Sequence, residues 1–110
     1  MRVLLDECVD QELRHSFEGH DCRSAGYAGL AGLKNGALLS AAEAAGFEVM
    51  ITTDQGIPHQ QNLRLRRIAI VILCGPTNRL ADLVFLVPDA LLVLESIVPG
   101  QVITVDKRVK

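Results

Sequence analysis

The sequence is poor in aromatic residues: it contains no tryptophan, one tyrosine and three phenylalanines, which together make up 4% of its 110 residues. A hydrophobic core must therefore be built from aliphatic side chains, and the hydrophobic fraction of 49% is ample for one. The shortage of aromatics also argues against a protein that binds single-stranded nucleic acid mainly by stacking bases on its side chains.

Cysteines are few as well. The three of them, Cys8, Cys22 and Cys74, lie far apart, and no pair has the Cys-x-x-Cys spacing. An odd number at these distances argues against a disulfide framework and against a cysteine-rich zinc site, and the histidines have no metal-binding spacing either. Reduced thiols are typical of the cytosol, so we expect a cytoplasmic protein in which Cys8 and Cys74 are small buried residues.

The sequence has no excess of positive charge, because 11 lysines and arginines stand against 13 aspartates and glutamates, for a formal net charge of −2. Domains that bind nucleic acid through their overall charge are usually basic, so any such binding must use a local patch. Long hydrophobic runs are also missing. The apolar run at residues 3–5 stops at Asp6 and Glu7, which is too short for a signal peptide, and no run approaches a membrane span. We therefore expect no membrane association.

The main feature that is present is an alternation of short apolar segments with helical patterns, over a length that fits a single domain, residues 1–110. In the central helix, Asn35 is the expected N-cap and Gly46 the stop. The alternation predicts an α/β fold, a three-layer α/β/α sandwich with a mostly parallel central sheet. Strands are expected at residues 3–5, 20–25, 48–53, 68–73 and 101–105, and helices at 10–17, 36–45, 79–86 and 88–97.

Acidic and amide side chains follow the predicted strands. Asp6 and Glu7 come directly after the first strand, Asp54 follows the strand at 48–53, and Asn78 follows the next strand. Ligands of open parallel sheets bind beyond the carboxyl ends of the strands, where these residues are expected to meet. Clustered carboxylates suit Mg²⁺ or Mn²⁺, and such an ion can activate water and polarise a phosphodiester. The alternative is that each aspartate only turns the chain or caps a helix.

A second group of polar residues could contact a substrate. The run at 54–62 is rich in amides, including Gln61 and Asn62, which can donate to phosphate or to base edges. Arg66 and Arg67 follow and could form a local phosphate-binding patch. The alternatives are a solvated loop and an ordinary exposed face.

The glycine-spaced loop at residues 26–36 does not match a phosphate-binding fingerprint, because it has neither G-x-G-x-x-G nor a following G-K-[ST]. A nucleotide-binding regulatory domain remains a third alternative that rests on this loop and on the order of the elements. The G-x-S-x-G pattern of a serine nucleophile elbow does not occur.

Several short motifs, taken in order, resemble those of PIN-like domains, and more closely those of a branch of small bacterial stand-alone PIN-like proteins. The resemblance covers roughly the first 75 residues in order and spacing. Its motifs are "LLDE" at 4–7, "GHDC" at 19–22, an alanine-rich helix and "TTD" at 52–54, with further markers at 34–36, 60–63 and 78–80.

The resemblance implies a Rossmann-like α/β/α sandwich and a Mg²⁺- or Mn²⁺-dependent ribonuclease, often a toxin of a toxin–antitoxin pair that dimerises. Asp6 matches the first metal-binding acid of the family, Asp54 matches the acid after the "TxD" strand, and Glu7 is an auxiliary ligand. The expected function is thus a toxin-like endoribonuclease whose catalytic residues are Asp6, Glu7 and Asp54. Its expected partners are RNA, an antitoxin-like protein and a second copy of the chain.

Two departures from the family pattern favour an alternative function. Many relatives carry an acid where this chain has Asn35, and many continue "D-x-D-F" where this chain reads "DQGI" from Asp54. Neutral oxygens would then have to complete the site, from Asn35, Gln61, Asn62 or Asn78. The alternative is a catalytically degenerate module that binds a protein partner or RNA, with the apolar stretch at 84–87 as a candidate contact surface.

Overall fold

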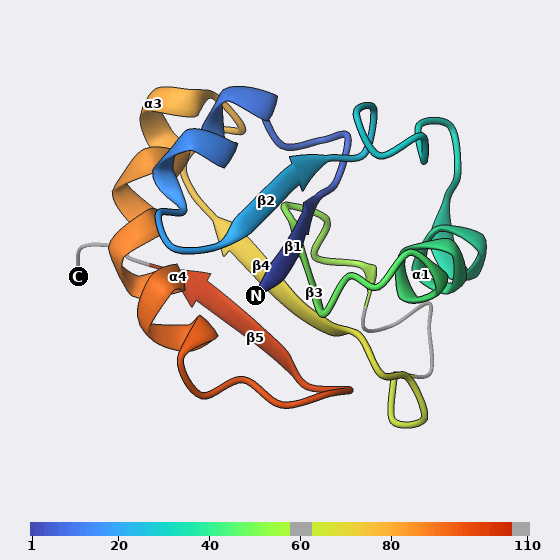
Figure 1. Cartoon of the computed structure of the whole chain (residues 1–110). Helices are drawn as coiled ribbons and strands as arrows, with labels where there is room; N and C mark the ends of the chain where they lie inside the picture. The colour runs from blue at the N-terminus through green and yellow to red at the C-terminus, as the bar shows by residue number, and fades with distance from the viewer. Residues whose placement is uncertain (58–62, 107–110) are drawn as a thin grey trace.

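The computed structural model describes residues 1–57 and 63–106. In this part of the chain a five-stranded sheet has the order β2-β1-β3-β4-β5, and every neighbouring pair of strands is parallel. The sheet crosses the centre of the molecule, with helices on either side (Figure 1). The predicted α/β class and parallel sheet are confirmed. The strands are β1 (Arg2–Leu5), β2 (Asp21–Ser24), β3 (Val49–Thr52), β4 (Ala69–Cys74) and β5 (Val102–Asp106).

Burial explains why the inner strands are almost continuously apolar. Every residue of β3 and β4 is buried, and so are the last three residues of β1. A strand covered on both faces has no solvent side, so its sequence does not alternate between apolar and polar residues. The outer strands β2 and β5 are partly exposed, and their sequences are correspondingly more polar.

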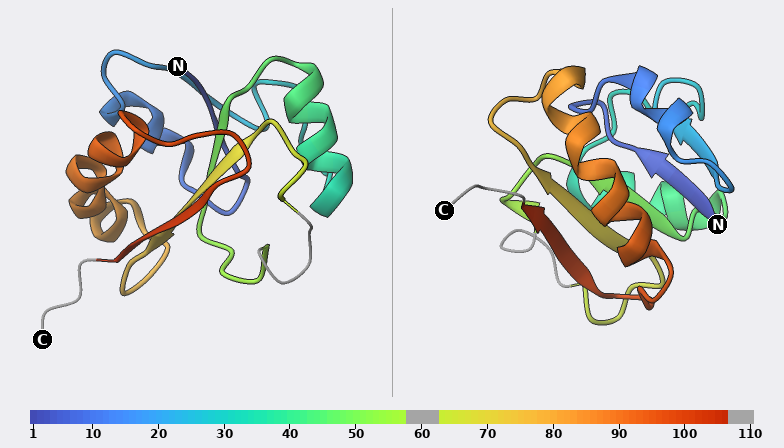
Figure 2. Two further views of the ribbon diagram at one scale, coloured as in Figure 1. Left: turned by 90° about the horizontal axis from the view of Figure 1, so that it is seen from below. Right: turned by 90° about the vertical axis from the view of Figure 1, so that its left-hand side faces the viewer.

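Two hydrophobic clusters lie on opposite faces of the sheet because successive strand residues point to opposite sides. Leu5 and Ile51 belong to the first cluster, which also holds buried residues of the helical segments after β1 and β4. Leu4 and Met50 belong to the second, together with buried residues of the helix between β2 and β3. Figure 2 shows the same division, with helical segments against both faces of the sheet.

The helices differ from the predicted ones mainly at their ends. Asp10 caps the helix expected at 10–17 by accepting from the Glu12 backbone N–H at 2.9 Å, but that helix is a 3₁₀ helix. The prediction that Asn35 is the N-cap of the central helix is wrong. Asn35 is already helical, and the extended residue before the helix is Lys34. Gly46, with a φ of 86°, ends that helix as expected. The helices that lie within the described residues are η1 (Gln11–Ser16), α1 (Asn35–Ala44), α3 (Leu80–Leu83), η2 (Val84–Leu86) and α4 (Val87–Leu94).

None of the helices in residues 1–57 and 63–106 is long and apolar enough to cross a membrane.

The strand order places a switch point between β1 and β3. From β1 the chain passes through η1 to β2 on one side, and from β2 it returns through α1 to β3 on the other side. The two connections pack on opposite faces, because η1 contributes to the first hydrophobic cluster and α1 to the second. In sheets with this order, the crevice beyond the carboxyl ends of these two strands is where ligands bind.

Gly100, in the turn before β5, combines a left-handed backbone with a close approach. Its φ is +79°, and an added Cβ would lie 2.9 Å from the carbonyl oxygen of Leu63. We expect Gly100→Ala to lower the free energy of unfolding by more than the roughly 1–2 kcal/mol that the left-handed conformation alone costs. Gly19→Ala is the matched control, because Gly19 has a φ of +82° with open space around it. Urea denaturation that gives equal losses for both variants would show that the approach to Leu63 is unimportant.

Candidate active site

Asp6 is held at the carboxyl end of β1 by contacts to β3. Its backbone N–H donates to the carbonyl oxygen of Ile51 at 3.0 Å, which continues the pairing of the two strands. Its side chain accepts from the Thr52 hydroxyl at 2.8 Å through Oδ2 and from the Glu7 backbone N–H at 2.8 Å through Oδ1. The Cys8 thiol is a third and longer donor to Oδ2 at 3.6 Å, so the carboxylate is oriented before any ligand arrives.

Thr52 connects Asp6 to Asp54. Its side chain is fully buried, and its Oγ1 accepts from the Asp54 backbone N–H at 3.1 Å while donating to Asp6. The Asp54 carboxylate in turn accepts from the Gly56 backbone N–H at 2.8 Å through Oδ1, which fixes the turn after β3. One buried hydroxyl thus sets the relative positions of the two aspartates that the sequence singled out.

Glu7 fastens the glycine-spaced loop to the site. Its Oε1 accepts from the Gly32 backbone N–H at 2.6 Å, across 25 positions of sequence. Gly32 has a φ of +84°, a conformation that glycine adopts without strain. The loop that lacks a phosphate-binding fingerprint therefore packs its backbone against an acid of the candidate site.

The three acids line one pocket, which we call the acidic pocket. Its volume is about 260 Å³, and Asp6, Glu7 and Asp54 are all in its lining. Lys34 is the one basic side chain among the described residues that line it. Its full lining is Asp6, Glu7, Cys8, Leu33, Lys34, Leu38, Leu39, Met50, Asp54 and Ile57. The structure thus brings together at the switch point the residues that the sequence placed at two strand ends.

The donor set of the acidic pocket fits a largely hydrated divalent ion better than one enclosed by protein ligands. A carboxylate offers about four lone-pair positions, so Asp6, Glu7 and Asp54 keep free positions beside the hydrogen bonds they already accept. Within residues 1–57 and 63–106, however, no three histidine, cysteine or acidic side chains form a group arranged to hold a metal ion. Mg²⁺ is commonly bound by one or two carboxylates while it keeps several waters, and this arrangement is compatible with the pocket.

The predicted amides are placed unequally. Asn78 lines a second cavity that also includes Asp6 and Glu7, so the structure does bring it to the site. Asn35 is the first residue of α1. It directly follows Lys34, which lines the acidic pocket. Gln61 and Asn62 lie outside the described residues.

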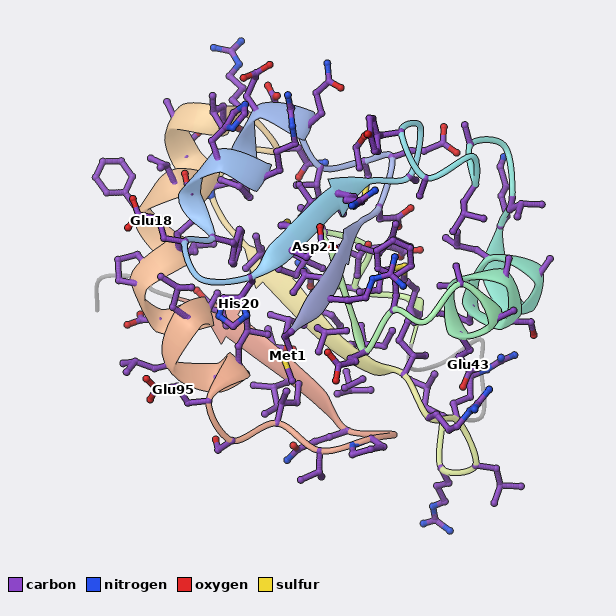
Figure 3. All side chains as sticks on the ribbon, in the orientation of Figure 1. Met1, Glu18, His20, Asp21, Glu43 and Glu95 are labelled. Atoms are coloured by element: carbon purple, nitrogen blue, oxygen red, sulfur yellow. The ribbon has the colours of Figure 1, made fainter. Side chains whose placement is uncertain are left out.

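The structure does not bring Arg66 and Arg67 to the acidic pocket. Both precede β4 and therefore stand at the amino end of that strand, whereas the acids stand at the carboxyl ends of their strands. The Arg66 guanidinium donates to Glu43 Oε1 at 2.8 Å and to the Ser40 hydroxyl at 3.0 Å, both on α1. Figure 3 shows Glu43 on the side of α1 that faces this loop. These contacts give Arg66 a structural role in joining the loop to the helix.

Sequence reasoning missed two residues of the site. Cys8 was expected to be buried, but it is exposed, lines both cavities, and places its Sγ 3.6 Å from Asp6 Oδ2. Cys74 is buried as expected. Thr52 was noticed only as part of the "TTD" motif. A threonine at the buried end of an otherwise aliphatic strand was the available signal, since a buried hydroxyl needs a partner.

Removing the Thr52 hydroxyl should loosen both aspartates. Thr52→Val preserves the shape of the side chain but leaves the Asp6 carboxylate and the Asp54 N–H without this partner, which we expect to cost about 1–3 kcal/mol of unfolding free energy. Thr52→Ser is the control, because it retains the hydroxyl. Thermal denaturation of both variants measures the difference. Equal stability of the valine variant and the wild type would contradict the bridging role.

Comparisons of the chain with protein-family models, with curated proteins and with solved structures find no match. The resemblance to PIN-like domains therefore stays a prediction from short motifs. The case for a function rests on the geometry of the acidic pocket.

Proposed function

We propose that the protein is a Mg²⁺- or Mn²⁺-dependent endoribonuclease, a toxin-like PIN-type enzyme whose active site is the acidic pocket. One observation carries the proposal: Asp6 and Glu7 after β1 and Asp54 after β3 line the same pocket at the switch point of a parallel sheet. Active sites of open α/β sheets lie at this position. Three carboxylates that line one pocket supply the oxygen ligands that Mg²⁺ and Mn²⁺ prefer.

Each residue of the pocket has a distinct part in the proposal. Asp6 and Asp54 hold the divalent ion, and Thr52 keeps the Asp6 carboxylate in its orientation. Glu7 lies beside them and orients the attacking water. When bound, the ion supplies activation of water and polarisation of the phosphodiester. Lys34, rather than Arg66 or Arg67, is placed to meet a phosphate, because it lines the pocket.

Cleavage of RNA tests the proposal directly. The wild-type protein is incubated with a mixture of structured and single-stranded RNAs in Mg²⁺, in Mn²⁺ and with a chelator. We expect internal cleavage with either ion and none with the chelator. Cleavage that persists with the chelator, or no cleavage of any RNA with either ion, would contradict the proposal.

A second candidate is a catalytically degenerate PIN-like module that binds a protein partner, such as an antitoxin-like protein or a second copy of the chain, or RNA. Two observations support it. Within residues 1–57 and 63–106, no three histidine, cysteine or acidic side chains form a group that could hold a metal ion, and several large apolar side chains are exposed. Of the stretch at 84–87, Val84 and Phe85 are exposed, whereas Leu86 and Val87 are buried in the core. Partner binding that is unaffected by a chelator, in a protein without nuclease activity, would favour this candidate.

A further inference from the structure

A second cavity, larger than the acidic pocket, shares residues 6–8 with it. Its volume is about 450 Å³, within the range of small-molecule sites. Asp6, Glu7 and Cys8 line both cavities, so the two adjoin one another. We call the second cavity the amide pocket, because Gln11 and Asn78 are in its lining.

Three connections of the fold converge on the amide pocket. Gln11 comes from the segment between β1 and β2, Ser24 from the end of β2, and Asn78 from the segment between β4 and α3. These residues are separated by 13 to 67 positions of sequence, so only the parallel arrangement of the strands brings them together. A site assembled in this way is not the by-product of a single turn or helix end.

The lining favours an uncharged ligand that offers hydrogen-bond donors. Among the described residues that line the amide pocket there is no lysine, arginine or histidine, whereas Asp6, Glu7 and Asp10 contribute carboxylates. A phosphate group would be repelled there. Asn78 and Gln11 can both donate and accept, and Asp10 Oδ1 accepts from the Glu12 backbone N–H at 2.9 Å, which leaves its other oxygen for a ligand.

We propose that the amide pocket binds a nucleobase of the RNA next to the cleaved phosphate, an inference that rests on the proposed ribonuclease function. A nucleobase is neutral and presents several donors and acceptors along one edge. Asparagine and glutamine pair with such edges, and carboxylates accept from amino groups of bases. No aromatic residue is found among the described residues of the lining, so the base is recognised by its edge rather than by stacking.

The acceptors in the lining of the amide pocket should also make it prefer some nucleobases to others. Asp10 contributes only acceptors, so a base whose exocyclic amino group offers two donor hydrogens can make one contact more than uracil, whose edge donates only through N3–H. Guanine, adenine and cytosine carry such a group. We therefore expect these bases to bind at least about fivefold more tightly than uracil.

Titration with nucleosides tests the amide pocket without requiring catalysis. The amide signals of the full chain are followed by NMR, in the absence of divalent ions, while guanosine, adenosine, cytidine or uridine is added. We expect signals of Gln11, Ser24, Gly26 and Asn78 to shift, with the weakest effect for uridine. Asn78→Ala and Gln11→Ala should abolish the shifts. Gln101→Ala, an exposed amide just before β5, should leave them unchanged.

The outcomes separate the two proposals. Nucleoside shifts at the amide pocket in a protein that never cleaves RNA would refute the nuclease and leave the base-binding pocket standing. Metal-dependent cleavage without such shifts would overturn the base-binding pocket alone. Shifts around the exposed Tyr27, lost in Tyr27→Ala but not in Asn78→Ala, would also overturn it, because the base would then stack on a ring outside the pocket.

Discussion

The Asp54→Asn variant is expected to lose divalent-ion binding and to cleave RNA about a hundredfold or more slowly than the wild type, because stabilisation of transition-state charge by a bound ion amounts to several kcal/mol. The substitution is nearly isosteric. The asparagine oxygen can still accept from the Gly56 N–H, so the turn after β3 keeps its hydrogen bond while the charge is lost. Single-turnover cleavage and Mn²⁺ calorimetry measure the two effects.

Asp54 is a cleaner target than Asp6. The two oxygens of the Asp6 carboxylate accept from the Thr52 hydroxyl, the Glu7 backbone N–H and the Cys8 thiol, and an amide has only one oxygen to offer them. Asp6→Asn would therefore disturb local structure as well as charge. Glu95→Gln is the matched control, since it removes one exposed carboxylate at the end of α4, a helix that lies on the opposite side of the molecule from α1 (Figure 1). If Asp54→Asn cleaves as fast as this control, the acidic pocket is not the active site.

The largest effect on stability is expected for Glu43→Ala. Glu43 Oε1 accepts from the Arg66 guanidinium at 2.8 Å, and Oε2 accepts from the backbone N–H groups of Arg67 at 2.6 Å and Ile68 at 3.3 Å. Only 13% of the Glu43 side chain and 21% of the Arg66 side chain are exposed. Alanine would leave the guanidinium and two N–H groups without this acceptor, which we expect to cost about 3 kcal/mol of unfolding free energy.

Glu12→Ala is the control for this loss. Glu12 also faces two basic side chains, Arg14 at 3.8 Å and His15 at 3.4 Å, but its own side chain is 55% exposed. Exposed ion pairs contribute at most about 1 kcal/mol, so Glu12→Ala should have a small effect. Urea denaturation at neutral pH compares the two variants, and equal losses would contradict the importance of burial.

The contribution of Glu43 should depend on pH. Burial opposes ionisation of the side chain, but the hydrogen bonds from Arg67, Arg66 and Ile68 outweigh it and hold the pKa of Glu43 below its ordinary value of 4.5. A lowered pKa means that the stabilisation is fully present above the unfolded-state pKa and is lost as the pH falls through the folded-state pKa. The stability difference between wild type and Glu43→Ala should therefore be constant above about pH 5 and shrink on acidification. A difference that grows in acid would contradict this assignment.

The strands and the meeting of the acids could be predicted because both depend on simple patterns. The apolar runs before Asp6 and Asp54 are short and flanked by polar residues, which defines buried strands, and parallel strands necessarily bring their carboxyl ends to one edge. Asp6 and Thr52 are 46 positions apart in the sequence, and the parallel pairing of their strands is enough to bring them together. Helix ends were less predictable. The single helix expected at 79–86 is divided into α3 and η2, and α4 then begins with Pro88 in its first turn, where a missing N–H costs nothing.

The positions of Arg66 and Arg67 could not be predicted from their closeness to Asp54 in the sequence. Arg66 and Arg67 follow Asp54 by about a dozen positions, which suggested a shared site. In a parallel sheet the connection from β3 to β4 must return to the opposite edge, so residues just before β4 lie far from residues just after β3. The Glu43 partner could not be inferred either, because it depends on how α1 packs against that connection.

Mn²⁺ titration followed by paramagnetic broadening of the backbone amide signals would locate a metal ion in the acidic pocket, because it reports where the ion binds as well as whether it binds. We expect signals of Glu7, Cys8, Thr53 and Asp54 to broaden first, and we expect Asp54→Asn to abolish the effect while Glu95→Gln does not. Broadening that is absent, or that is centred on another part of the chain and unchanged by Asp54→Asn, would contradict the acidic pocket as a metal-dependent active site.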